Sequence, residues 1–217
     1  MTEAMKMKPR AVAMDLIRTT ALDGAAYRAR GGQDAPSANW GMLDRLTAAL
    51  TAWQEESALR EKALLLIEWL AVEMAGYTVS MLGDEAGSWL AEFGDEVRRE
   101  QRHDHPAGPT AIEILTIILD SEGQEARQGP FGDGRLQRIG VPYVRYLRVG
   151  RSLEDVRELA LTLALWAGGQ LTSLMGDDAE RVTGYLDDRD PAPRTRPRPG
   201  RGSGSGVFAA PHVVGGA

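Results

Sequence analysis

The chain contains no cysteine among its 217 residues. Disulfide bonds, thiol nucleophiles and thiolate metal ligands are therefore excluded. Lysine is scarce, with 3 residues against 22 arginines, which is typical of a GC-rich genome and indicates a bacterial protein. The absence of cysteine fits a reducing compartment, and we expect the protein to be cytoplasmic.

The sequence also lacks a catalytic signature and a strong membrane segment. Basic residues precede a short apolar run near the N-terminus, but Asp15 and Arg18 interrupt that run, so it makes a poor signal peptide. Residues 159–176 are free of charge, yet their length lies at the lower edge for spanning a bilayer. We expect no membrane span, no cofactor and no metal site.

A near-repeat is the main feature that is present. Residues 80–86 read SMLGDEA and residues 173–179 read SLMGDDA, an offset of 93. An offset of 97 aligns residues 9–32 with 106–129, and 8 of the 24 positions are identical, where composition alone predicts roughly two. One four-residue deletion in a loop-like stretch reconciles the two offsets. We therefore predict an internal duplication of about 90 residues packed about a pseudo-two-fold axis.

The spacing of apolar residues predicts four helices in each copy, hence an all-α fold of about eight helices. In the first copy these helices are expected from Pro9 to about Arg30, after an Asn39 cap, from about Ser57 to Leu82, and after Gly83. Glycine is expected to end the third helix, and Asp84 is expected to cap the fourth.

The duplication also bears on the apolar segment 159–176. Its counterpart, residues 66–83, contains Glu68 and Glu73, and two carboxylates would be costly in a membrane span. We therefore interpret both third helices as core helices, one fully buried and one partly exposed.

The expected organisation is a first helical unit over 1–104 and a second unit over 105–190, packed on the first as one globular body. Residues 191–217 are rich in Pro, Arg, Gly and Ser and end in a short apolar stretch. This composition predicts a flexible, disordered tail that could dock as a tethered peptide.

One candidate catalytic pattern lies at residues 98–105. Arg98 precedes His103, and Arg99 precedes His105, at spacings that loosely resemble the Arg-x4–6-His motif of the all-helical HEPN-type ribonucleases. The resemblance implies that Arg stabilises the phosphate charge while His transfers the proton. The alternative interpretation is a solvated basic helix terminus.

A basic aromatic segment at residues 135–151 is the candidate anionic-ligand site. No acidic residue lies between Asp133 and Glu154, and Pro142 is expected to break or bend the helix. Arginine interleaved with tyrosine is typical of surfaces that bind phosphates or stack on bases. The alternative is a face whose arginines pair with the acidic body, and a net charge of −6 argues against bulk nucleic-acid binding. The candidate residues are Arg135, Arg138, Tyr143, Arg145, Tyr146 and Arg148.

These features favour a non-enzymatic helical interaction, adaptor or assembly protein that docks protein partners through its body and its tail. Two alternatives remain: an RNA-directed nuclease using residues 98–105, and a binder of an anionic or nucleic-acid ligand through 135–151. A homo-oligomer is compatible with all three.

Overall fold

A computed structural model of the chain confirms the all-α class. It describes residues 8–31, 40–100, 107–125, 133–150 and 153–189, which contain helices and turns and no strand. The tail, 191–217, lies outside the described residues. In chain order the elements are α1 (Pro9–Ala29), α2 (Trp40–Glu55), α3 (Leu59–Leu82), a 3₁₀ turn (Gly83–Glu85), α4 (Ala86–Glu100), α5 (Ala107–Glu125), α6 (Asp133–Gly150), α7 (Leu153–Leu174) and α8 (Ala179–Arg189).

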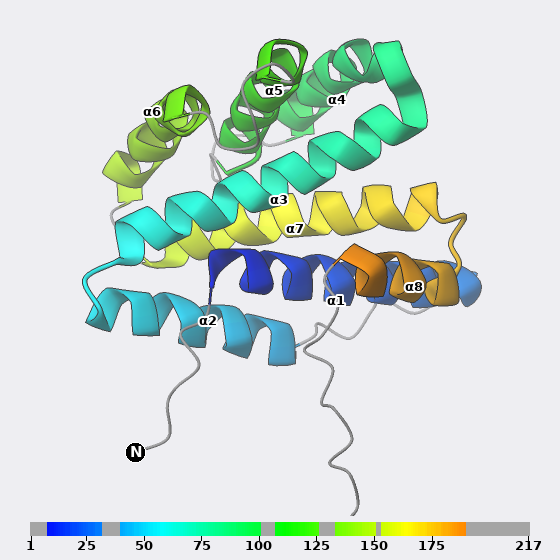
Figure 1. Ribbon diagram of the computed structural model, residues 1–217, viewed down its shortest axis with the longest axis horizontal. Helices are drawn as coiled ribbons and strands as arrows, with labels where there is room; N and C mark the ends of the chain where they lie inside the picture. The colour runs from blue at the N-terminus through cyan, green and yellow to red at the C-terminus, as the bar shows by residue number, and fades with distance from the viewer. Residues whose placement is uncertain (1–7, 32–39, 101–106, 126–132, 151–152, 190–217) are drawn as a thin grey trace, which may run out of the picture.

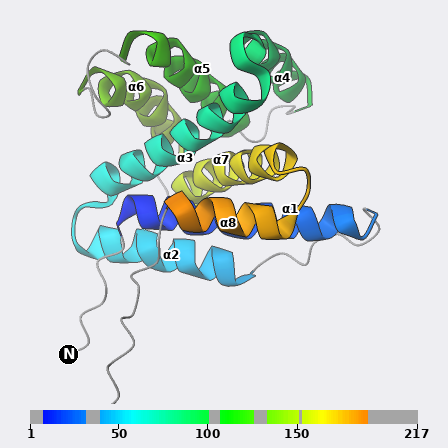
Figure 2. The ribbon, with the colours of Figure 1, turned by 45° about the vertical axis from the view of Figure 1, so that its right-hand side comes forward.

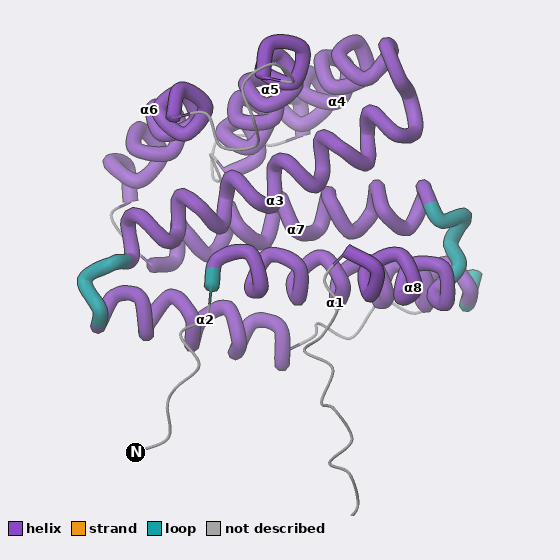
Figure 3. The backbone as a smooth tube through the Cα atoms, in the orientation of Figure 1, coloured by secondary structure: helices purple, strands orange, loops and turns teal. Residues whose placement is uncertain are grey.

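The two longest helices, α3 and α7, pack against each other at the centre of the molecule (Figure 1). Helices α4, α5 and α6 lie on one side of this pair, and α1, α2 and α8 lie on the other (Figure 2). Helix α1 contacts α7, α3, α8 and α2, whereas α5 contacts α3, α7, α4 and α6. The first helix of the chain therefore packs against its last two helices (Figure 3).

Small residues line the contact between α1 and α7. Each helix buries three alanines among its larger apolar residues, and Gly168 is buried against Thr20. A Cβ atom on Gly168 would lie 2.8 Å from the backbone nitrogen of Ala21, closer than real Cβ contacts allow. Close approach of this kind lets side chains on one helix reach the backbone of the other.

The glycine that ends each central helix behaves as the sequence predicts. Gly83 has φ +55° and Gly176 has φ +69°, a region that favours glycine. The predicted cap at Asp84 is wrong, because this residue lies inside the 3₁₀ turn that precedes α4. In the second copy of the near-repeat, residues 173–179, the helix cap lies one position later than Asp84 does in the first. The Oδ1 atom of Asp178 accepts two backbone N–H bonds from the first turn of α8, at 2.8 and 3.2 Å.

Burial in the two central helices differs from the expectation of one fully buried and one partly exposed helix. In α3, Glu68 and Glu73 are 3 % and 8 % exposed. Each is paired: Arg135 Nε lies 2.9 Å from Glu68, and Arg189 lies 2.5 Å from Glu73. Helix α7 is not fully buried, since Leu165 is 57 % exposed. Buried carboxylates are tolerated here because a guanidinium from α6 or α8 meets each one.

One helical stretch in the described residues, Leu59–Glu100, is long and apolar enough to cross a membrane by length and composition. Helices α7 and α8 meet that criterion only as a pair bent by 113°. More than half of the apolar window in Leu59–Glu100 is buried inside the protein, as in the core helix of a globular fold.

Candidate functional site

Helix α6 carries the basic aromatic segment that the sequence singles out. The helix continues through Pro142, so of the predicted break or bend the break does not occur. Pro142 is buried, as are Ile139 and Tyr143 beside it. Packing of this helix against α5, α3 and α7 offsets the loss of one backbone hydrogen bond at the proline.

Arg135, at the start of α6, has a structural role. Its Nε–H donates to Glu68 Oε1 at 2.9 Å, and the two side chains are 11 % and 3 % exposed. The pair joins α6 to α3 inside the protein. A guanidinium held in this way neutralises a buried carboxylate and is not presented to a ligand.

The two tyrosines of the segment are buried and offer no ring face for stacking. Tyr143 is 1 % exposed and Tyr146 is 4 % exposed. Burial raises the pKa of both, and for Tyr146 the nearby Glu158 and Asp155 raise it further. Both hydroxyls therefore keep their protons through the physiological range.

The remaining arginines point to different surroundings. Arg145 is exposed, and its two terminal nitrogens donate to the Glu113 carboxylate of α5 at 3.3 Å each. Arg138 is exposed on the same helix. The side chain of Arg148 lies outside the described residues. Of the described arginines of the segment, Arg135 is therefore withdrawn into the protein, while Arg138 and Arg145 are exposed.

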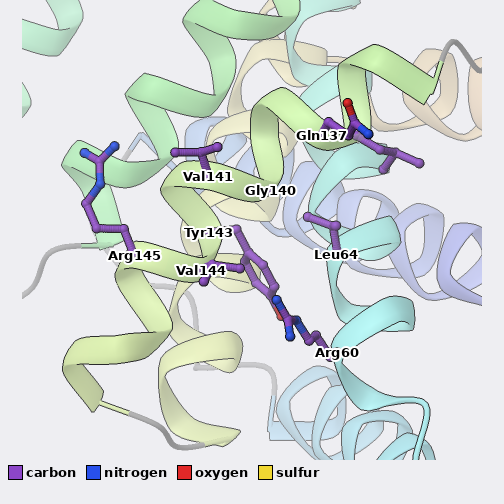
Figure 4. Close-up of a pocket in the computed structure, with 9 residues that line it drawn as sticks. Arg60, Leu64, Gln137, Gly140, Val141, Tyr143, Val144 and Arg145 are labelled. Carbon is purple, nitrogen blue, oxygen red and sulfur yellow. The ribbon is translucent and has the colours of Figure 1, made fainter.

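A groove between α3 and α6 takes in part of the segment and adds a residue that the sequence did not suggest. Its volume is about 630 Å³. Tyr143 and Arg145 line it together with Arg60 of α3, and Figure 4 shows these side chains. We call this the α3–α6 groove. Its lining residues are Arg60, Leu64, Leu136, Gln137, Gly140, Val141, Tyr143, Val144 and Arg145.

The polar end of the groove is formed by Arg60 and Tyr143. The Tyr143 ring extends from α6 toward the Arg60 side chain (Figure 4). Its hydroxyl oxygen is buried and has no hydrogen-bond partner in the described structure. The Arg60 guanidinium is exposed and lowers the pKa of Tyr143, against the larger effect of burial. Among the described residues no carboxylate pairs with Arg60.

The apolar part of the groove comes from Leu64, Leu136 and Val144, with Val141 at the rim. Val141 is 60 % exposed, although it lies on a helix that otherwise buries its apolar residues. A hydrocarbon wall beside an exposed, unpaired guanidinium is suited to a ligand with an apolar body and an anionic end.

Of the nuclease-like pattern, only the two arginines lie within the described residues. Arg98 pairs with Asp95 at 2.9 Å, and Arg99 Nε donates to the Asp95 backbone oxygen at 3.1 Å. His103 and His105 lie outside the described residues. Within the described residues no group of three potential metal ligands gathers.

Comparison with protein-family models, curated proteins and solved structures found no match to this chain. Arg60 could not have been found from the sequence alone. It is a lone arginine at the start of a helix, and only the packing of α3 against α6 brings it to Tyr143.

Proposed function

We propose that this chain is a non-enzymatic helical binding protein that holds an anionic ligand with an apolar body in the α3–α6 groove. One observation carries the proposal: an unpaired Arg60 guanidinium lies beside the unpartnered Tyr143 hydroxyl at one end of an apolar groove. The ligand chemistry is a carboxylate or phosphate attached to a hydrocarbon or aromatic body.

The two polar groups have complementary parts in this proposal. Arg60 supplies fixed positive charge and several N–H donors. Tyr143 supplies one O–H donor, and its raised pKa keeps that proton in place. Arg60, the exposed member of the pair, therefore donates toward a ligand oxygen and has no acceptor of its own. Arg145 adds a second cation. Its hydrogen bonds to Glu113 are long, at 3.3 Å, so a ligand anion can replace Glu113 as its partner.

We also propose that the chain is an internal duplication and that the groove, which joins α3 of the first copy to α6 of the second, is not repeated between α7 and α2. In support, the helix contacts correspond when α1–α4 are exchanged with α5–α8: α1 with α7 corresponds to α5 with α3, and α1 with α8 to α5 with α4. The offset of 93 places Leu153 opposite Arg60 and Leu50 opposite Tyr143. The polar end of the groove thus has apolar residues at the corresponding positions of the other copy.

The proposal also covers the binding of a protein partner. An aspartate or glutamate beside apolar side chains on a protein partner presents the same chemistry as a small amphiphile. A chain that recognises such a surface would work as an adaptor or assembly protein. Displacement of bound octanoate by an acidic apolar peptide would assign the groove to a protein partner, whereas octanoate binding without such displacement would assign it to a small molecule.

The test uses three eight-carbon probes: octanoate, octyl phosphate and octanol. Isothermal titration calorimetry on the full chain should show tighter binding of the two anions than of the neutral alcohol. Arg60→Gln should weaken octanoate binding by about tenfold or more, since a hydrogen bond to a charged group contributes about 1.5–3 kcal/mol. Octanol binding should change little.

Arg138→Gln is the matched control, because it removes one exposed cation from α6 without touching the groove. Its octanoate affinity should equal that of the unaltered chain. Equal affinities for octanoate and octanol, or equal losses in the two arginine variants, would show that the groove is not an anion site.

A further inference from the structure

A second cavity opens on α4, away from the α3–α6 groove. Its volume is about 500 Å³. Two rings form one wall: Trp89 stacks on Phe93 with centroids 5.1 Å apart. Behind this wall, Phe93 meets Trp166 of α7 edge-on at 4.9 Å. We call this the acidic aromatic cleft. Its lining residues are Trp89, Glu92, Phe93, Asp95, Glu96 and Arg99.

The acidic side chains of the cleft are not all neutralised. Asp95 pairs with Arg98, and Arg99 donates to the Asp95 backbone. Glu92 and Glu96 form no hydrogen bond or ion pair within the described part of the chain. Two unpaired carboxylates thus line the same cleft as two aromatic rings, an arrangement that attracts a cation through both charge and ring quadrupole.

On the opposite side of the molecule, arginines of the chain itself lie against aromatic rings. There the Arg189 guanidinium lies 5.1 Å from the Tyr185 ring centroid and 2.5 Å from Glu73. Arg10 similarly lies 5.2 Å from the Trp69 ring centroid. Ring, carboxylate and guanidinium occur together, and the guanidinium comes from the helices themselves.

The acidic aromatic cleft also has rings and carboxylates, but its residue that corresponds to the Arg189 cation of α8 is an acid. The offset of 93 aligns Glu96 with Arg189 and Glu92 with Tyr185. No guanidinium stacks on Trp89, Phe93 or Trp166 among the described residues. Arg99 lines the cleft, but its Nε–H donates to the Asp95 backbone oxygen and it stacks on neither ring. A guanidinium stacked on these rings would therefore come from outside the described helices.

We propose that the acidic aromatic cleft binds the segment 193–201 of the same chain. This segment reads PRTRPRPGR and supplies four arginines and no acid. Guanidinium groups stack on the aromatic wall and pair with Glu92 and Glu96. The prolines suit the same wall, because Pro-rich segments dock into aromatic-lined grooves. The charge of the segment is complementary to a chain whose net charge is −6.

The connection is long enough for binding within one molecule. Arg201 is 12 residues beyond Arg189, the end of α8. At roughly 3.3 Å per residue a stretch of this length reaches up to about 40 Å, similar to the length of a 24-residue helix such as α3. Tethering also keeps the segment at an effective concentration that can reach the millimolar range.

The cysteine-free chain allows a direct test with two spin labels. One label is attached at Ser88→Cys, exposed on α4 one turn before Glu92, and the other at Ser203→Cys. Double electron–electron resonance on the full chain should show a narrow short-distance population. A control pair, Ala48→Cys on exposed α2 with Ser203→Cys, should show a broad distribution.

Charge exchange supplies the specificity test. Changing Arg194, Arg196 and Arg198 to Glu should abolish the short-distance population, and so should Glu92→Lys with Glu96→Lys. Combining both sets should restore it. Circular dichroism checks that each variant retains its helices. A short distance unaffected by either reversal would overturn the proposal, as would one that vanishes on dilution with unlabelled chain, since it would then join two molecules.

Discussion

Thr20 of α1 and Thr172 of α7 each donate a hydrogen bond to the backbone of the other helix. Thr20 Oγ1 lies 2.9 Å from the Ala164 carbonyl oxygen, and Thr172 Oγ1 lies 2.9 Å from the Ala21 carbonyl oxygen. Each hydroxyl also contacts a carbonyl on its own helix, at 3.0 Å and 2.7 Å. The two bonds fix the register of α1 against α7 in a contact too close for larger side chains.

Gly168→Ala should therefore destabilise the protein by about 1–3 kcal/mol, since the added methyl would meet Thr20 and the α1 backbone. The neighbouring Gly169→Ala is the matched control, because nothing lies within 4 Å of its Cβ position. That control should raise stability by up to about 1 kcal/mol through helix propensity. Urea denaturation measures both, and equal effects would contradict the close approach.

Thr172→Val should cost about 1 kcal/mol of unfolding free energy, because it replaces a buried hydroxyl with a methyl of similar size. Thr183→Val on α8 is a suitable comparison, since its hydroxyl bonds only to its own helix, at 2.8 Å to the Ala179 carbonyl oxygen. A larger loss at the α8 position would show that the bond between helices contributes little.

Removing Arg135 should be among the most damaging single changes. Arg135→Ala leaves Glu68 buried without its cation, and breaking a buried pair in this way typically costs about 3–5 kcal/mol. The double variant Glu68→Leu with Arg135→Leu should recover most of that loss, because Leu161 occupies the position that the offset of 93 aligns with Glu68. Denaturant unfolding of the single and double variants distinguishes the two outcomes.

Three buried tyrosines predict a loss of stability in alkali. Burial raises the pKa of Tyr77, Tyr143 and Tyr146 above the value of about 10 found in the unfolded chain. The native state then holds protons that the unfolded state releases, so the free energy of unfolding is unaffected below about pH 10 and falls above it. Each tyrosine contributes a slope of about 1.4 kcal/mol per pH unit in that window.

Urea denaturation between pH 8 and pH 11.5 measures this slope. Tyr143→Phe should reduce the slope by the contribution of one tyrosine, about 1.4 kcal/mol per pH unit, while leaving the acidic side of the pH profile unchanged. A profile that is the same for Tyr143→Phe and the unaltered chain would mean that this hydroxyl is not buried in the native state.

Local sequence patterns predicted the helices well and the site poorly, for a physical reason. Helix ends depend on nearby residues, so the repeated stretches 80–86 and 173–179 were enough to predict that Gly83 and Gly176 end their helices. Burial depends on which helices meet. Arg135 belongs to an exposed-looking basic run, yet it lies inside the protein because Glu68 of another helix faces it.

The α3–α6 groove illustrates the same limit. The sequence pointed to Tyr143 as a stacking surface, but its ring is 1 % exposed and its hydroxyl oxygen is buried as well. The partner that gives the hydroxyl a role, Arg60, comes from a helix that ends long before α6 begins. No periodicity or charge pattern links two such positions, because their proximity is a property of the tertiary fold.

The contact of α1 with α7 has a consequence for synthesis of the chain. Helix α1 ends at Ala29, and α7 begins only at Leu153. At roughly 5–20 residues per second the ribosome needs several seconds to deliver that partner. Throughout this interval the face of α1 that contacts α7 lacks its permanent cover, so the native packing of α1 is complete only after the far end of the chain emerges.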